Sequence, residues 1–184
     1  MLATQFNVEA LHILLAQPVS TDMISHLAAA ASGMVDGGPE LALGLPRLPS
    51  FEEFISHLSA QPEITTPIIM SALVYLERLK RKMVPLKRPH SAGYRLFLAA
   101  LVLSFKYNND VQYTIRAWSE MSCMLTQNHA FWLDCDTIKT TERQVLRLLG
   151  WDLSISEEAL LHELEPLLAP IRQQLLRRQA WRLV

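Results

Sequence analysis

Glycine, cysteine and charge of one sign are all scarce in this sequence of 184 residues. Six glycines leave little room for the many tight turns of an all-β sandwich or barrel. Two cysteines, Cys123 and Cys135, are too few for the disulfide framework of a small secreted domain, which indicates a reducing compartment. Seventeen basic and eighteen acidic residues give a formal net charge of −1, whereas nucleic-acid and anionic-membrane binders carry a basic excess. We therefore expect neither nucleic acid nor membrane among the partners.

Long apolar runs are also missing. A membrane-spanning helix needs about 20 consecutive apolar residues. The most apolar run, Leu96 to Leu103, has Arg95 and Lys106 close on either side. Half of all residues are nevertheless hydrophobic and only 19% are charged, which suffices for a large core. The length predicts one domain with short appendages.

Motifs of catalysis and metal binding are absent as well. The sequence contains no glycine-rich phosphate loop, no His-Glu-x-x-His pair and no nucleophile elbow. Cys123, His129 and Cys135 come nearest to a metal cluster, but they are six residues apart. Zinc knuckles space their cysteines about two to four residues apart. We expect ordinary loop residues there, and predict no catalytic residue, no metal site and no cofactor.

The pattern that is present is helical. Alternation of the strand type is absent, and residues that favour helix N-caps precede several apolar repeats. These candidate caps are Thr21, Ser50, Asp136 and Ser156. Thr66-Pro67 places a proline in the first turn of another helix, where no hydrogen bond is lost. Two further prolines, Pro166 and Pro170, are expected to divide the C-terminal helical region.

The stretch from Ser91 to Tyr107 differs from the others because its middle is apolar on every face. A soluble helix of that kind must be surrounded by other helices. A buried strand is the alternative, but alanine, leucine and the lack of flanking turn signals favour a helix. The sequence thus predicts an all-α fold around this helix. We expect an N-terminal helical arm and linker at 1–46, a main body at 47–155 and a C-terminal helical extension at 156–184. The helix of the arm should pack Met23, Ile24 and Leu27 on the main body, because its apolar face is too large to leave in water.

Four segments carry a family resemblance. They are Pro18 to Ile24, Thr66 to Leu79, Tyr94 to Asp110 and Glu142 to Leu153. In this order they resemble the cyclin box, and within it the fungal Pcl-type cyclins that activate the phosphate-pathway kinase of yeast. The resemblance implies a single five-helix cyclin box. It also implies a regulatory subunit, itself not an enzyme, that binds the catalytic subunit of a cyclin-dependent kinase and stabilises the active position of its regulatory helix.

The resemblance further implies which residues bind the kinase. Cyclins grip their kinase with a lysine at the end of the third box helix and a glutamate on the fifth. Lys106 and Glu142 stand at those positions. Tyr107, Leu146 and Trp151 match apolar positions that pack on the regulatory helix of the kinase. We expect Lys106 and Glu142 to lie close together on one face, where the third and fifth helices meet, and Leu146 and Trp151 to be at least partly exposed in the isolated chain. For Leu146, burial in the core of the box is the alternative.

Asp110 follows Lys106 by four residues and is a further candidate. The Pcl-type group suggests a kinase that is active without a phosphate on its activation loop, so another anion must orient the arginines that bind such a phosphate. A carboxylate can accept a bidentate arginine pair. The alternative is that Asp110 caps the following turn.

Two segments depart from the family pattern. Residues Ser122 to Asp136 form a longer connection than in the Pcl relatives and are expected to be irregular. Residues Phe51 to Ile55 do not match the Met-Arg-Ala-Ile-Leu docking patch of cell-cycle cyclins, so substrates are not expected to dock there.

The family also implies a setting. It suggests cell-cycle, morphogenesis or nutrient control, location in nucleus and cytoplasm, and protein substrates reached through the complex. The alternative function is a helical adaptor or a transcription-factor-like module with the same fold. A basic face and a second box would favour that alternative, and neither is evident in the sequence.

Overall fold

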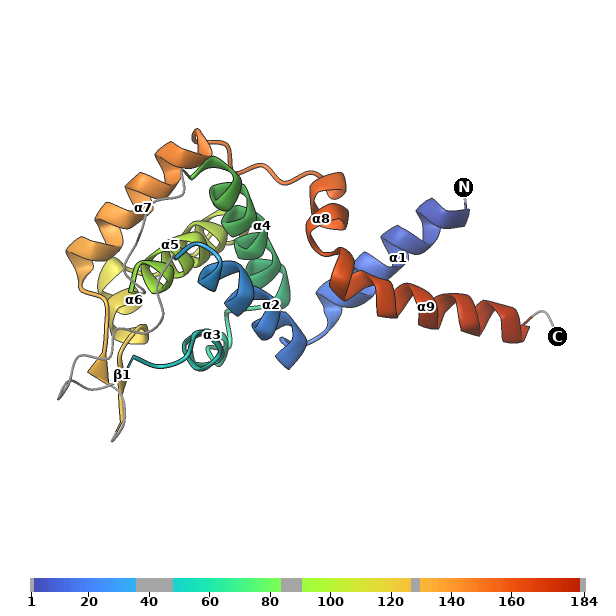
Figure 1. Ribbon diagram of the computed structural model, residues 1–184, viewed down its shortest axis with the longest axis horizontal. Helices are drawn as coiled ribbons and strands as arrows, with labels where there is room; N and C mark the ends of the chain where they lie inside the picture. The colour runs from blue at the N-terminus through green and yellow to red at the C-terminus, as the bar shows by residue number, and fades with distance from the viewer. Residues whose placement is uncertain (1, 36–47, 84–90, 127–129, 183–184) are drawn as a thin grey trace.

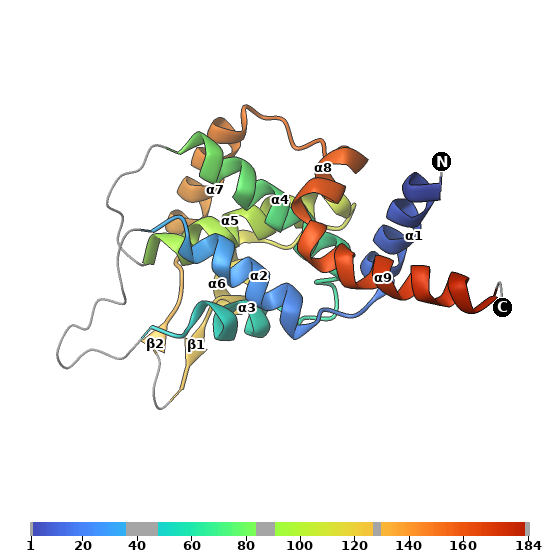
Figure 2. The same cartoon turned by 45° about the vertical axis from the view of Figure 1, so that its right-hand side comes forward.

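The computed structural model describes residues 2–35, 48–83, 91–126 and 130–182 (Figures 1 and 2). In this part of the chain there are nine helices and one two-stranded hairpin. The helices are α1 (Leu2–Ala16), α2 (Thr21–Ser32), α3 (Phe51–Ser59), α4 (Thr66–Lys82), α5 (Ser91–Asn108), α6 (Ile115–Met121), α7 (Cys135–Leu149), α8 (Glu157–Glu163) and α9 (Glu165–Arg182). The all-α prediction is confirmed.

Helix α5 is the centre of the fold. Its residues from Ala92 to Phe105 are buried, apart from Arg95. Helices α4 and α7 pack along it, and α2 covers a further side (Figure 1). Ser104 lies in this apolar packing and donates a hydrogen bond of 2.7 Å to the Ile68 carbonyl of α4, so its hydroxyl is not left unsatisfied. The central helix expected from the sequence is therefore confirmed.

Two of the expected N-caps are present. At the start of α3, Ser50 accepts a hydrogen bond from the Glu53 amide at 3.1 Å, and the Glu53 carboxylate accepts one from the Ser50 amide at 2.7 Å. This reciprocal pair is a capping box. Ser156 caps α8 by accepting from the Ala159 amide at 3.2 Å.

The other two N-cap predictions are wrong. The cap of α2 is Ser20, not Thr21, and the cap of α7 is Asp134, not Asp136. In both places two residues with capping ability stand close together, and the local sequence does not decide between them. The Asp134 carboxylate accepts from the amides of Asp136 and Thr137, which starts α7 early enough to bring Ile138 into the core.

The expected division of the C-terminal region by its prolines is confirmed at Pro166, which follows the break between α8 and α9, and is wrong at Pro170. Helix α9 runs from Glu165 to Arg182 with Pro170 inside it. Pro166 lies in the first turn, where its missing amide removes no intrahelical bond. Pro170 costs one hydrogen bond, and burial of Leu168 on the same helix opposes that loss. The break between α8 and α9 is at Leu164, whose side chain is buried.

The segment expected to be irregular contains the hairpin of β1 (Met124–Leu125) and β2 (Ala130–Phe131), which pair antiparallel. Phe131 anchors it, because its ring centroid lies 5.4 Å from that of Phe54 and 4.8 Å from that of Tyr94. The outer face of the hairpin is exposed. The strands are two residues each, too short for sequence alternation to reveal.

The N-terminal arm is packed. Helix α2 lies against α3, α4 and α5 and buries Met23 and Leu27, while Ile24 is half-buried. Packing of these three side chains on the main body was predicted and is confirmed. Helix α1 packs instead on α9, and the two project side by side from the body (Figures 1 and 2). Arg172 of α9 donates to the Asn7 side chain of α1 at 2.7 Å.

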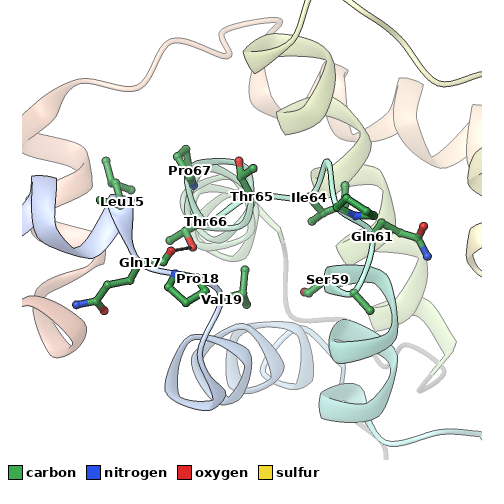
Figure 3. Close-up of a pocket in the computed structure, with 13 residues that line it drawn as sticks. Leu15, Gln17, Pro18, Val19, Ser59, Gln61, Ile64, Thr65, Thr66 and Pro67 are labelled. Carbon is green, nitrogen blue, oxygen red and sulfur yellow. Dashed lines mark hydrogen bonds between the residues drawn. The ribbon is translucent and has the colours of Figure 1, made fainter.

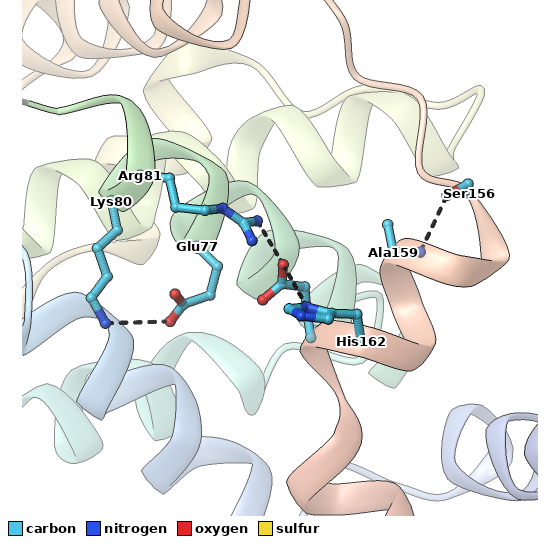
Figure 4. Close-up of polar contacts among 7 residues, drawn as sticks. Glu77, Lys80, Arg81, Ser156, Ala159 and His162 are labelled. Carbon is cyan, nitrogen blue, oxygen red and sulfur yellow. Dashed lines mark hydrogen bonds and ion pairs between the residues drawn. The ribbon is translucent and has the colours of Figure 1, made fainter.

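An ion-pair cluster attaches α8 to α4 (Figure 4). Arg81 lies 2.6 Å from the Glu163 carboxylate, whose side chain is only 11% exposed. His162 approaches the same carboxylate at 3.4 Å, and Lys80 pairs with Glu77 at 3.8 Å. Because Glu163 is mostly removed from water, its cationic neighbour compensates a charge that would otherwise be costly to bury.

Candidate protein-binding surface

A pocket of about 790 Å³ lies where the α1–α2 connection meets the α3–α4 loop (Figure 3). Its wall is closed by a hydrogen bond of 2.5 Å from the Thr66 hydroxyl to the Gln17 carbonyl. No acidic, basic, histidine or cysteine side chain lines it. The hydroxyls of Ser59, Thr65 and Thr66 line the pocket, but its lining contains no side chain that could act as a general base toward them.

Clusters of metal-binding side chains are not found among the described residues. Cys123 and Cys135 are both half-buried free thiols, and His129 lies outside the described residues. Within the same residues, no helix is long and apolar enough to cross a membrane.

The C-terminal end of α5 and the middle of α7 bring two of the predicted residues together. The Lys106 ammonium lies 2.5 Å from the Glu142 carboxylate, across 36 residues of sequence. Their side chains are 35% and 12% exposed. The prediction that Lys106 and Glu142 lie close together on one face is confirmed.

Each residue of this pair is placed by its helix. Lys106 follows the last buried residue of α5, Phe105, in the turn where a cation is favoured by the helix dipole. Glu142 lies between Thr141 and Val145, which are buried residues of α7. Because α5 and α7 pack together, the rim of their contact holds both charges at the edge of the core.

Exposed aromatic side chains lie at the C-terminal ends of α5 and α7. Tyr107, beside Lys106, is 54% exposed, and Trp151, just past α7, is 69% exposed. Leu146 is half-buried and packs against the core. The alternative of full burial for Leu146 is therefore wrong, and partial exposure of both Leu146 and Trp151 is confirmed.

The backbone at Trp151 is left-handed, with φ of 62°, directly after Gly150 with φ of 73°. The Gly150 amide donates to the Arg147 carbonyl at 3.0 Å, and the Trp151 amide to the Leu146 carbonyl at 2.9 Å. This bonding closes the end of α7. Glycine adopts such a φ freely, but a bulky residue in this region is an outlier. The sequence predicts a helix end at Gly150 and contains no signal for the conformation of Trp151.

Asp110 is exposed, just past α5. Within the described residues its carboxylate accepts no hydrogen bond and forms no ion pair. The following turn is closed instead by the Gln112 side chain, which donates to the Asn109 carbonyl at 2.6 Å. The turn-capping alternative for Asp110 is therefore wrong. Its predicted role toward a kinase stays a prediction.

Tyr75 of α4 supports this surface from behind, and sequence reasoning gave it no role. It is fully buried, and its hydroxyl donates to the Leu153 carbonyl at 2.8 Å. Burial is the largest cause that raises the pKa of Tyr75, and Tyr107 and Asp152 raise it further through their charges.

We name the exposed parts of Lys106, Tyr107, Glu142, Leu146 and Trp151 the α5–α7 surface. Its exposed tyrosine and tryptophan are side chains enriched in binding hot spots, and its charge pair can set the register of a partner. It carries no nucleophile paired with a base. The arrangement suits recognition of another protein.

Comparison with known proteins also supports a role in binding another protein. Residues 49–154, which contain α3 to α7, match the model of the cyclin N-terminal domain. The chain is 36% identical over 178 residues to PHO85 cyclin-1 of Saccharomyces cerevisiae. It is 29% identical over 173 residues to PHO85 cyclin-2 and 30% over 165 residues to PHO85 cyclin-9 of the same yeast. These alignments cover 92%, 91% and 86% of this chain but only 61%, 53% and 51% of the relatives.

Proposed function

The chain belongs to the cyclin family, and we propose that it is a regulatory subunit, itself not an enzyme, that binds and activates a cyclin-dependent protein kinase. The chain spans between about half and three fifths of the length of the relatives it matches. Those relatives are named as cyclins of PHO85. The first partner to test is therefore the PHO85 kinase, with protein substrates reached through the complex.

The mechanism is a shift of population. Kinase catalysis requires an ion pair between the lysine that holds the nucleotide phosphates and a glutamate on the regulatory helix. In a kinase without its partner this helix swings out and the pair is broken. A subunit that binds the active arrangement more tightly than the inactive one raises the active fraction by that difference in affinity.

The observation that carries the proposal is the Lys106–Glu142 ion pair, with Tyr107 and Trp151 exposed at the ends of the same helices. Aromatic anchors supply most of the energy of such contacts, while charged groups set register and orientation. Leu146 is half-exposed and adds an apolar contact. Asp110 would meet the arginines that otherwise bind an activation-loop phosphate.

We extend the proposal to the setting of the complex. The complex of the chain with its kinase acts in the nucleus and cytoplasm. Its role is in cell-cycle, morphogenesis or nutrient control, and its partners include neither nucleic acid nor membrane. Residues 1–46 are an arm and linker, 47–155 the cyclin box and 156–184 an extension. The similarity to PHO85 cyclins does not favour the alternative, a non-kinase adaptor with the same fold.

Co-purification followed by a kinase assay tests the function. The tagged chain is mixed with purified PHO85 kinase, and phosphate transfer to a protein substrate is measured across a titration. We expect a stable one-to-one complex and a saturable rise in activity. Binding without any rise would favour the adaptor, and absence of binding would contradict the proposal. A chain carrying Arg116→Ala serves as control, because the Arg116–Glu120 pair on α6 is 84% and 67% exposed.

A further inference from the structure

Trp151 is held in an unfavourable backbone conformation by a hydrogen bond to its own helix, α7, and by hydrogen bonds from α4 to the residues on either side of it. We propose that Tyr75 is a positioning residue, which fixes the segment after α7 so that the Trp151 side chain stays outward, ready for the kinase. This inference rests on the proposed function. It adds a buried residue of α4 to a surface formed by α5 and α7.

The segment Leu149–Ser154 is tied to the body at both ends. The Lys82 ammonium donates to the Leu149 carbonyl at 3.3 Å, and the Tyr75 hydroxyl donates to the Leu153 carbonyl at 2.8 Å. Both donors come from α4, seven residues apart. Trp151 lies between the two tied carbonyls, so its backbone is fixed from either side.

A turn within the segment adds a further restraint. The Asp152 carboxylate accepts from the Ser154 amide at 3.0 Å and from its hydroxyl at 2.6 Å. These bonds lower the pKa of Asp152, and the charges of Arg78 and Lys82 lower it further. The turn therefore stays charged and closed at neutral pH.

These hydrogen bonds from α4 matter because the left-handed backbone conformation of Trp151 is unfavourable. A residue with a side chain is less stable in the left-handed conformation than in the right-handed one, because its Cβ approaches the following carbonyl oxygen. Such residues persist only where the surrounding structure determines them. If the Leu153 tie were lost, Trp151 could leave the left-handed region, and the fraction of molecules that present the indole outward would fall.

The hydroxyl of Tyr75, and not the volume of its ring, is the part of the side chain that holds the segment after α7. A phenylalanine would fill the same buried space, so packing alone does not require the oxygen. Burying a hydroxyl is favourable only when it finds a partner, and here that partner is the Leu153 carbonyl. Removing the oxygen leaves the shape of the core and frees the segment.

Tyr75→Phe is the test variant, and Tyr94→Phe is its matched control. Tyr94 is also fully buried, and its hydroxyl also donates to a backbone carbonyl, that of Pro49 at the start of α3. Both substitutions therefore remove a buried hydrogen bond, and only one of them touches the segment at Trp151. Asp152→Ala is a second test variant, at an exposed position, should Tyr75→Phe fail to fold.

Two readouts are needed. In the free chain, the heteronuclear NOE of the Trp151 indole N–H reports its order, and Trp151→Phe assigns that signal among the four tryptophans. In the complex, calorimetry gives the Kd for PHO85 kinase. If the outward state falls to about one tenth of molecules, the apparent Kd rises about tenfold.

We expect Tyr75→Phe to lower the NOE of Trp151 and to raise the Kd, while Tyr94→Phe changes neither beyond about twofold. An unchanged NOE in folded Tyr75→Phe, or in Asp152→Ala where Tyr75→Phe does not fold, would overturn the proposal. A lower NOE with unchanged Kd would overturn it as well. Failure of the wild-type chain to bind the kinase would contradict the proposed function, and the NOE would still decide whether Tyr75 orders Trp151.

Discussion

Lys106 and Glu142 are 36 residues apart in sequence and 2.5 Å apart in the fold. The glutamate is the more buried of the two, with 12% of its side chain exposed against 35% for the lysine. An ion pair at the rim of a helix contact is already ordered before a partner arrives. A partner that meets it therefore loses less conformational entropy on binding.

Truncation of either residue should weaken kinase binding while leaving the free chain folded. We expect Lys106→Ala and Glu142→Ala each to cost about 2 kcal/mol or more of binding free energy, if the contact is desolvated. The free energy of unfolding should fall by only about 0–1 kcal/mol for Glu142→Ala, which leaves the partly exposed Lys106, and by more for Lys106→Ala, which leaves the mostly buried Glu142 carboxylate unpaired. Calorimetry and urea unfolding measure the two quantities, with Arg116→Ala as control. Wild-type affinity in both variants would contradict the assignment.

Trp151 should be the strongest apolar anchor. We expect Trp151→Ala to weaken kinase binding by about 2 kcal/mol or more. Leu146→Ala should weaken it less and should also destabilise the chain, because Leu146 packs against the core. Trp181, on α9, is 82% exposed and provides the matched control. Equal affinities of Trp151→Ala and Trp181→Ala would contradict the anchor.

Asp110 should affect activation more than affinity. With kinase that is unphosphorylated on its activation loop, Asp110→Ala and Asp110→Asn should bind nearly normally and activate poorly. Phosphorylation of the loop should restore activity, because a phosphate supplies the missing anion. Rates of phosphate transfer at saturating cyclin measure the effect. If the asparagine variant activates like wild type, a charge at this position is not required.

The N-terminal arm should contribute to stability. Leu27→Ala on α2 removes a fully buried side chain, which costs about 2–5 kcal/mol in well-packed cores. Deletion of residues 1–46 should also lower the melting temperature. Ser25→Ala, at an exposed position of the same helix, should change stability by no more than about 0.5 kcal/mol. An unchanged melt after deletion, with unchanged kinase binding, would make the arm dispensable.

Two tyrosines should make the fold sensitive to alkali. Burial raises the pKa of Tyr94 to about 12, and a hydrogen bond to Glu63 raises the pKa of Tyr113 to about 12. A pKa raised by folding contributes stability that is complete below the unfolded value of about 10 and is lost as pH rises toward the folded value. The melting temperature should therefore fall between about pH 10 and pH 12. Tyr113→Phe should reduce that fall, and an identical pH profile would contradict the assignment.

Much of the fold follows from patterns that the sequence displays openly. The residues from Leu96 to Leu103 are apolar on all faces of the helix. In a helical fold such a helix is stable only at the centre, where other helices cover every face. Similarity to three PHO85 cyclins confirms the resemblance to the Pcl-type group. The pairing of Lys106 with Glu142 was predictable only through that resemblance, because no local pattern links residues on separate helices.

Other features depend on tertiary contacts. Ser20 and Thr21 are both residues that favour the N-cap position, so local preference does not decide between them. The position at which α2 begins packing on the main body decides that Ser20 is the cap. Continuity of α9 through Pro170 needs the packing of its buried leucines. The outward position of Trp151 depends on Tyr75, which is far away in sequence, so neither residue alone reveals it.

A charge exchange across the α5–α7 surface separates recognition from folding. The double variant Lys106→Glu/Glu142→Lys keeps an ion pair within the chain but reverses both charges toward a partner. Activity of PHO85 kinase is titrated with wild-type and exchanged chains of equal melting temperature. We predict a saturable rise with the wild type and little or no rise with the exchanged chain. Equal activation by both chains, or none by the wild type, would contradict a cyclin that acts through this pair.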